Sequence, residues 1–163
     1  VTAGWYDNVN SIINDQNITY RGIQVYDKVA NNRCAADYPF LSIERINTKS
    51  VNTGGRLKRM IRFLKNIKAD SKQKIDLSSF DINAICYNID IDAYKDLHYL
   101  YLVTIVFLQL HKIAYDESYA NSITSVDGKE YIFRGNNKRR EVATMLQNVS
   151  TIYSILKEQH LII

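Results

Sequence analysis

Two segments of this chain repeat apolar residues with the period of an α-helix, and this pattern constrains the fold more than any other feature. One segment spans residues 57–67 and the other spans residues 142–156. The apolar positions are Leu57, Met60, Ile61, Leu64 and Ile67 in the first, and Val142, Met145, Leu146, Val149, Ile152, Tyr153 and Leu156 in the second. Intervals of three and four place these side chains on one helix face, which must be buried against other elements.

The other predicted elements complete a mainly α fold. We expect helices over most of 56–68, 79–89, 97–116 and 138–158, and another from Pro39 to about Thr48. The 97–116 segment is apolar nearly all round, which predicts a central buried helix. Asp127-Gly128 between two β-prone runs predicts a β-hairpin at about 123–133, because that turn needs residues that tolerate positive φ. Residues 5–13 fit a short helix, and residues 18–29 fit a strand. The sequence therefore predicts an irregular helical bundle with one β-hairpin and a short N-terminal strand.

The composition fits one folded domain. The chain has 163 residues, of which 46% are hydrophobic and 23% charged, close to the values of soluble globular proteins. We expect a single domain over 1–163, with 1–36 as a connecting segment and 37–163 as the helical core. The chain starts at Val1, within what reads as a folded region, so we expect a fragment of a longer protein.

The two cysteines, Cys34 and Cys86, form neither a disulfide framework nor a zinc signature. Together with the absence of a signal peptide, this predicts a reduced, cytoplasmic protein. The most apolar stretch, residues 97–115, carries several polar side chains and is too short to span a bilayer, so we expect no membrane partner.

One predicted helix is strongly basic. Residues 56–68 hold six cations and no acid, namely Arg56, Lys58, Arg59, Arg62, Lys65 and Lys68. At about 100° per residue, Arg62 points away from the apolar face, whereas Lys65 lies on its flank. A lysine on the flank can bury its stem and aim its ammonium into a neighbouring cleft. The helix therefore either binds an anion or is a solvated basic face.

The start of the next helix is a second candidate for anion binding. Ser78 or Ser79 would be its N-cap. A serine hydroxyl beside free backbone N–H groups also suits phosphate oxygens, so Ser79 is either a phosphate ligand or a plain cap. Phe80 follows directly and offers an aromatic face.

Three runs, Tyr38–Asn47, Gly55–Lys65 and Leu77–Ile82, resemble the C-terminal helical half of a polymerase-β-type nucleotidyltransferase. The nearest relatives would be the bacterial cyclic-oligonucleotide synthases, which are related to cyclic GMP–AMP synthase and oligoadenylate synthase. In that family a lysine on such a helix and a serine that opens the next one grip the donor triphosphate, and the following aromatic residue stacks on the base. The resemblance thus implies nucleotide binding by Lys65, Ser79 and Phe80, with Phe80 in place of the more usual tyrosine.

The catalytic carboxylates of this family are missing from the chain. The family carries a Gly-Ser turn, an Asp-x-Asp pair and a third Asp, which hold two divalent ions. The only Asp-x-Asp is Asp90-Ile91-Asp92, without a preceding Gly-Ser turn, and we interpret it as turn or cap carboxylates. The resemblance implies a parent enzyme that transfers a nucleoside monophosphate from ATP or GTP to a hydroxyl. Its N-terminal catalytic domain would hold Mg²⁺, and this chain alone would be inactive, with no catalytic or metal-binding residue.

A second basic cluster leaves another interpretation open. Arg134, Lys138, Arg139 and Arg140 precede or begin the last predicted helix, where cations oppose the helix dipole. They either meet acidic partners or form a solvated rim. Together with the basic helix, they would also suit a non-enzymatic helical module that binds nucleic acid or an acidic partner.

Overall fold

The computed structural model describes residues 2–6, 21–34, 36–94 and 98–162. The chain divides into two compact units, Val1–Asn47 and Thr48–Ile163. The boundary falls within helix α1 (Pro39–Asn52), which begins at the predicted proline and continues four residues beyond the predicted end. None of the described helices is long and apolar enough to cross a membrane.

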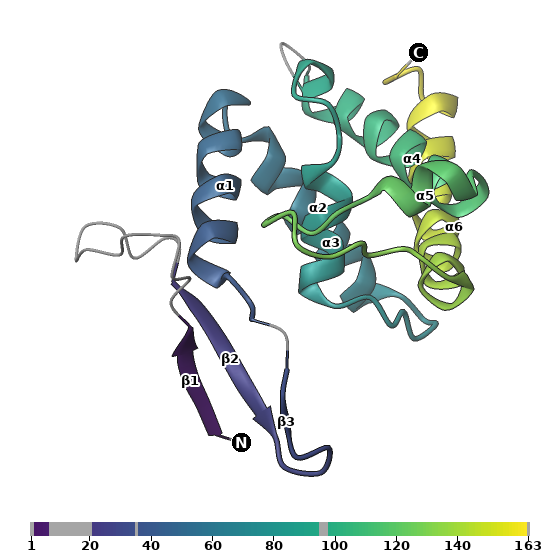
Figure 1. Ribbon diagram of the computed structural model, residues 1–163. Coiled ribbons are helices and arrows are strands. Elements are labelled where there is room, and N and C mark those ends of the chain that lie inside the picture. The colour runs from purple at the N-terminus through teal and green to yellow at the C-terminus, as the bar shows by residue number, and fades with distance from the viewer. Residues whose placement is uncertain (1, 7–20, 35, 95–97, 163) are drawn as a thin grey trace. The chain divides into compact units, whose positions relative to one another are not determined.

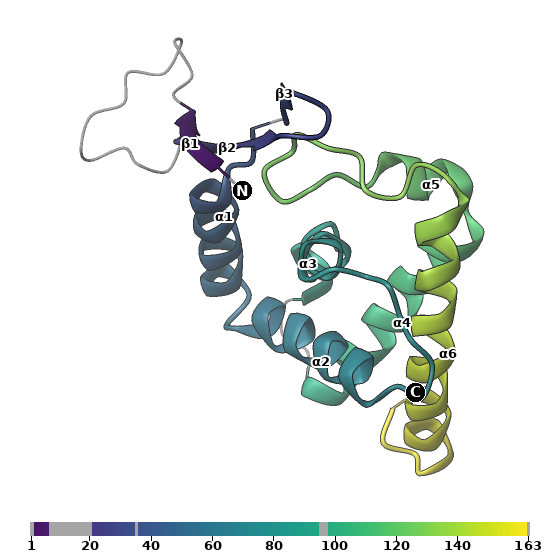
Figure 2. The ribbon, with the colours of Figure 1, turned by 90° about the horizontal axis from the view of Figure 1, so that it is seen from below.

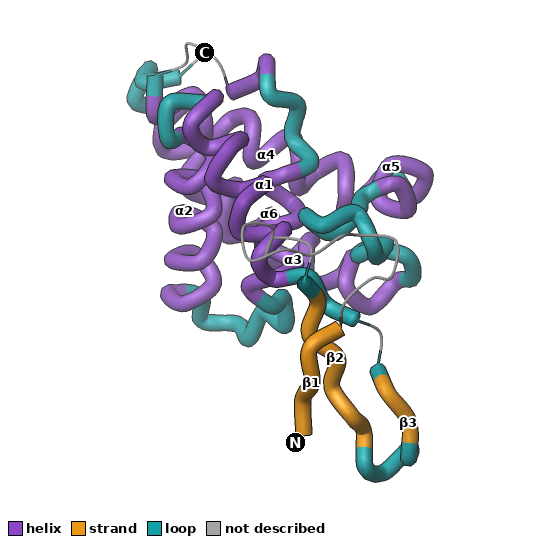
Figure 3. Tube along the Cα trace, turned by 60° about the vertical axis from the view of Figure 1, so that its left-hand side comes forward, coloured by secondary structure: helices purple, strands orange, loops and turns teal. Residues whose placement is uncertain are grey.

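The first unit contains a three-stranded antiparallel sheet in the order β1-β2-β3 (Figure 3). The strands are β1 (Thr2–Tyr6), β2 (Gly22–Asp27) and β3 (Asn32–Arg33). The predicted strand is confirmed over β2, while residues 18–20 lie outside the described residues. The helix predicted from Trp5 is wrong at Trp5 and Tyr6, which pair with β2 instead, and residues 7–13 lie outside the described residues. A partner strand distant in sequence decides this conformation, so local periodicity could not reveal it.

The second unit contains the predicted helices (Figure 1). They are α2 (Arg56–Asp70), α3 (Ser79–Tyr87), α4 (Tyr99–Tyr115) and α6 (Asn136–Glu158). Two short helices, a 3₁₀ turn at Asp92–Tyr94 and α5 (Glu117–Ser122), were not predicted. α4 packs along α6, and α2 packs against α3, α4 and α6 (Figure 2). The mainly α fold class is confirmed.

Helix α4 is buried on one face only, which corrects the prediction of a helix buried all round. Leu102, Val106 and Leu110 are fully buried. On its other side Leu108 is 52% exposed and Tyr115 is 68% exposed. An almost uniformly apolar sequence has too little contrast to show which side its neighbours cover.

The predicted hairpin is present as a single antiparallel bridge, between Thr124 and Tyr131, rather than as two strands. Gly128 has φ 74°, as the turn requires. The Ser125 hydroxyl accepts hydrogen bonds from the backbone N–H groups of Lys129 (3.1 Å) and Glu130 (3.0 Å). These hydrogen bonds occupy backbone N–H groups that follow the turn. Those groups therefore do not extend the pairing into two full strands.

Burial of Cys86 in α3 predicts a specific alkaline sensitivity. Burial raises the pKa of its thiol to about 12, although the nearby charges of Lys65 and Lys49 lower it. Between pH 9 and pH 12 the unfolded chain releases this proton while the folded chain keeps it. The free energy of unfolding should therefore fall as pH rises, by at most about 1.4 kcal/mol per pH unit from this group. Urea unfolding of the protein and of Cys86→Ala should show a shallower slope for the variant.

The exposed thiol of Cys34 supplies the matched control for this measurement. Cys34→Ala should retain the pH slope of the unaltered protein. Equal slopes in the unaltered protein and in Cys86→Ala would contradict the prediction.

Candidate functional site

Lys65 lies at the edge of the buried face of α2. That face includes Leu57, Ile61 and Leu64. Lys65 follows Leu64 and is half-buried, whereas Arg62 is exposed. The charge of Lys65 lies close enough to Cys86 of α3 to oppose the rise in the pKa of that thiol. Cys86 lies in the last turn of α3, so this observation relates Lys65 to that end of the helix and not to Ser79 in the first turn.

The first turn of α3 is closed by Ser78, not by Ser79. The Ser78 hydroxyl accepts from the Asp81 backbone N–H at 3.1 Å. One carboxylate oxygen of Asp81 accepts from both the backbone N–H and the hydroxyl of Ser78, at 2.8 Å each. The interpretation of Ser79 as a plain cap is therefore wrong. Ser79 is the first helical residue and is exposed, and no hydrogen bond among the described residues uses its hydroxyl. Phe80 is half-buried.

Side chains of α2 and α6 hold the segment that leads into α3. The Lys68 ammonium donates to the Leu77 carbonyl at 2.6 Å. The Asp76 backbone N–H donates to the Glu141 carboxylate at 2.7 Å. The Lys138 ammonium donates to the other carboxylate oxygen of Asp81 at 2.7 Å. The position of Ser79 is therefore set by residues on both sides of it.

Asp81 and Lys138 were not predicted as parts of this site. A capping box places an acidic or amide side chain three residues after the serine, so the spacing from Ser78 to Asp81 was a usable signal. Lys138 had no such signal, because its partner lies 57 residues away in the chain.

Acidic groups lie beside part of the second basic cluster, which the sequence left open as either paired with acids or a solvated rim. Lys138 pairs with Asp81. Arg139 lies 3.6 Å from the Glu117 carboxylate and donates to the Ala114 carbonyl at 3.2 Å. Both cations thus contact neighbouring helices, and Arg139 is half-buried, whereas the side chain of Lys138 stays 48% exposed.

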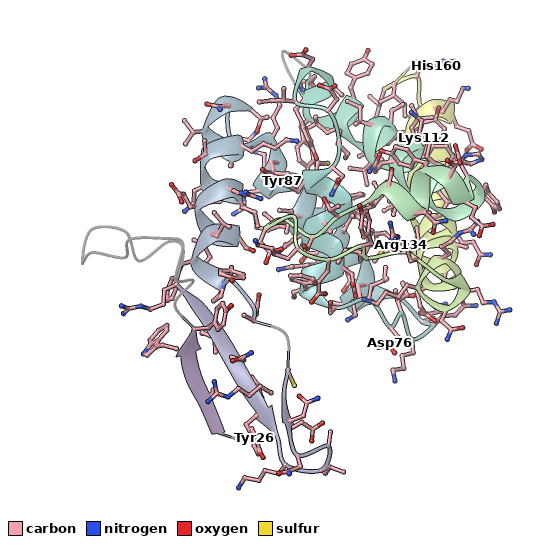
Figure 4. The ribbon with its side chains drawn as sticks, viewed as in Figure 1. Tyr26, Asp76, Tyr87, Lys112, Arg134 and His160 are labelled. Carbon is pink, nitrogen blue, oxygen red and sulfur yellow. The ribbon has the colours of Figure 1, made fainter. Side chains whose placement is uncertain are left out.

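Lys49 holds the opposite end of α3. Its ammonium donates to the carbonyls of Tyr87 and Ile89, at 2.6 Å each. Burial lowers the pKa of Lys49, and the nearby charge of Asp90 opposes this shift. A cation at a helix C-terminus also interacts favourably with the helix dipole. Figure 4 labels Asp76 and Tyr87, which lie near the two ends of α3.

Asp90 and Asp92 form a turn, as interpreted from the sequence. The Asp90 carboxylate accepts from the Asp92 backbone N–H at 2.8 Å, just before the 3₁₀ turn. Within the described part of the chain, no three His, Cys, Asp or Glu side chains gather where they could hold a metal ion. The described residues therefore do not fit the two-ion site of the resembling enzymes.

The groups that could meet a phosphate lie on two packed helices. The charge of Lys65 on α2 acts on Cys86, in the last turn of α3, whereas Ser79 opens the first turn of that helix. The N-terminus of α3 offers backbone N–H groups and the hydroxyl of Ser79, and the ring of Phe80 follows. Cationic and helix N-terminal groups bind phosphate oxygens well, and an aromatic ring can stack on a base.

The sequence of this chain matches a family of known proteins and several individual members of that family. Residues 44–154 match the cGAS/DncV-like nucleotidyltransferase C-terminal helical domain. The chain is 53% identical over 159 residues to a c-di-GMP synthase of Capnocytophaga granulosa, covering 96% of the chain and 45% of that protein. It is 46% identical over 169 residues to a c-di-GMP synthase of Flavobacteriaceae sp., covering the whole chain and 46% of that protein. The chain thus spans about half the length of the curated relatives it matches.

Solved structures agree with this assignment. The STING-associated CdnE c-di-GMP synthase from Capnocytophaga granulosa superimposes with a TM-score of 0.85 at 50% identity, covering 96% of this chain and 50% of that chain. The Elizabethkingia meningoseptica CdnE cyclic dinucleotide synthase with GTP and Apcpp gives a TM-score of 0.64, covering 84% of this chain and 52% of that chain. At 20% identity it shows a shared fold alone. The match over residues 44–154 and the identity to full-length relatives show that this chain belongs to the cGAS/DncV-like nucleotidyltransferases and carries their C-terminal helical domain.

Proposed function

We propose that this chain is the C-terminal helical half of a bacterial c-di-GMP synthase, which joins two molecules of GTP and releases two molecules of pyrophosphate. The observation that carries this proposal is the 53% identity to the Capnocytophaga granulosa c-di-GMP synthase over nearly the whole chain. The cytoplasm would supply GTP, and the free thiols of Cys34 and Cys86 suit that compartment.

Within this enzyme, Lys65 and Ser79 would bind the triphosphate of GTP, and Phe80 would stack on its base. The half-buried Lys65 and the uncommitted hydroxyl of Ser79 support these roles. A triphosphate held at several points is oriented for in-line attack on the α-phosphorus, which lowers the entropic part of the barrier. The Lys65 charge would also stabilise negative charge on the departing pyrophosphate.

Mg²⁺ would be held by the N-terminal catalytic domain of the full-length protein. There it would activate the attacking hydroxyl and neutralise phosphate charge. The described residues of this chain have no carboxylate cluster for it, so their part is limited to binding and orienting the nucleotide.

This division of labour predicts that the chain by itself makes no product. The purified chain, incubated with labelled GTP and Mg²⁺ or Mn²⁺, is expected to give no cyclic or linear dinucleotide. The full-length protein under the same conditions is expected to convert GTP into c-di-GMP, with ATP as the comparison substrate. Metal-dependent product from the chain alone would contradict the assignment of the catalytic groups to another domain. A full-length protein that uses ATP in preference to GTP would contradict the c-di-GMP assignment.

Membership of a nucleotidyltransferase family argues against the alternative of a module without enzymatic function. One observation still favours a nucleic-acid contact in addition to nucleotide binding. Lys58, Arg59 and Arg62 of α2 are exposed, and the described residues show no ion pair for any of them. A nucleic-acid face would lose affinity steeply with added salt.

A further inference from the structure

We call Lys65, Ser79 and Phe80 the nucleotide clamp, and we propose that Lys138 is a positioning residue for it: through Asp81, Lys138 fixes the first turn of α3, which presents Ser79 and Phe80. This inference rests on the proposed function, because it takes Ser79 and Phe80 as nucleotide-binding residues.

The Asp81 carboxylate joins α6 to the start of α3. Asp81 is only 2% exposed. One of its oxygens accepts from Lys138 of α6 at 2.7 Å. The other accepts from the backbone N–H and the hydroxyl of Ser78. Both carboxylate oxygens of Asp81 thus accept hydrogen bonds. Ser79 and Phe80 lie between Ser78 and Asp81 in the chain, so these bonds hold the turn that contains them.

A second residue of α6, Glu141, contacts the segment that leads into α3. Glu141 accepts from the Asp76 backbone N–H at 2.7 Å. Lys138 and Glu141 are three residues apart, so they lie on the same face of α6. The two contacts hold the segment on both sides of Ser78.

The location of Lys138 is unfavourable for α6 itself. The helix starts after Gly135, with no side-chain cap and no acidic residue in its first turn. A cation near a helix N-terminus opposes the helix dipole. The stabilisation that Lys138 supplies therefore goes to α3, through Asp81, rather than to its own helix.

The pair also matters electrostatically for a bound triphosphate. An unpaired carboxylate at Asp81, two residues after Ser79, would repel phosphate oxygens at the start of α3. Lys138 compensates this charge. Lys138 therefore fixes the geometry of the first turn of α3. It also reduces the electrostatic repulsion between Asp81 and an anion bound at the N-terminus of that helix.

The test compares Lys138→Ala with Lys138→Arg in the full-length protein. Lys138→Ala is expected to raise KM for GTP by about 10-fold, because displaced Ser79 and Phe80 would bind the nucleotide less tightly, while kcat stays within about 3-fold. Lys138→Arg, which keeps the charge, is expected to restore most of the loss. Arg140→Ala is the matched control, because Arg140 is an exposed cation in the same part of α6 and should leave KM unchanged. If Lys138→Ala does not fold, Lys138→Gln, which keeps a donor without the charge, should show the same rise in KM.

Double variants separate positioning from other roles. In a Ser79→Ala, Phe80→Ala background, Lys138→Ala should add little, because groups that act through one another are not additive. Full additivity would overturn the proposal, as would a lower Tm with unchanged KM in Lys138→Ala. If Ser79→Ala with Phe80→Ala raises KM and Lys138→Ala does not, the positioning role of Lys138 is wrong, while nucleotide binding by Ser79 and Phe80 is supported. If neither change affects KM, both proposals fail.

Discussion

Lys65→Ala in the full-length protein is expected to lower kcat/KM for GTP by about 10-fold or more, since a charge-assisted hydrogen bond contributes roughly 1.5–3 kcal/mol. Lys65 is half-buried on α2, which packs against α3, and its role requires the ammonium to reach a phosphate that also meets Ser79. Thermal stability should change little, because the described residues show no hydrogen bond or ion pair for this side chain. Steady-state kinetics with GTP and a thermal unfolding curve provide the two measurements.

Arg62→Ala is the matched control for this prediction. Arg62 lies on the same helix, three residues earlier, and is exposed. Its replacement removes the same charge from α2 and should change kcat/KM little. A larger loss from Arg62→Ala than from Lys65→Ala would contradict the clamp. The basic face of α2 would then be better interpreted as a surface for nucleic acid or a partner protein.

Asp81→Ala is expected to lower the free energy of unfolding by about 3 kcal/mol, because it removes three hydrogen bonds to a charged acceptor and opens the capping box of α3. The Asp81 side chain is 3% exposed and accepts three hydrogen bonds, from Lys138 and from two groups of Ser78. For a protein of this size the change corresponds to a decrease in Tm of about 6–12 °C. Urea and thermal unfolding both measure it.

Asp76→Ala provides the control for Asp81→Ala. Asp76 is an exposed acid in the segment that enters the same helix, and its described hydrogen bond uses the backbone N–H, which alanine keeps. Its replacement should shift Tm by no more than a few degrees. Equal shifts in the two variants would show that the carboxylate of Asp81 does not stabilise α3 as its contacts indicate.

Much of the helical unit could be predicted from the sequence because its signals are local. The apolar residues of α2 and α6 recur with the helical period, and Gly54 and Gly55, with φ of 57° and 80°, interrupt the chain between α1 and α2. The candidate residues Lys65, Ser79 and Phe80 came from the resemblance to a family, combined with the positions of helix faces and helix starts. Their roles remain predictions.

Other structural features depend on contacts with residues that the local sequence pattern does not identify. Trp5 and Tyr6 form a strand because β2 pairs with them. The roles of Ser78 and Ser79 were distinguished only by the hydrogen bonds of Asp81, since either serine could have begun the helix.

The sequence by itself determined where most helices of the second unit begin and end, because a helix buries one face at a fixed period and its ends are set by nearby residues. Only the tertiary structure decided which face of α4 is covered and which acid compensates Lys138. Burial and ion pairing join residues far apart in the chain, and their energies depend on distances that exist only after the helices have packed. For the same reason, the contact between α6 and the start of α3 becomes visible only in the folded chain.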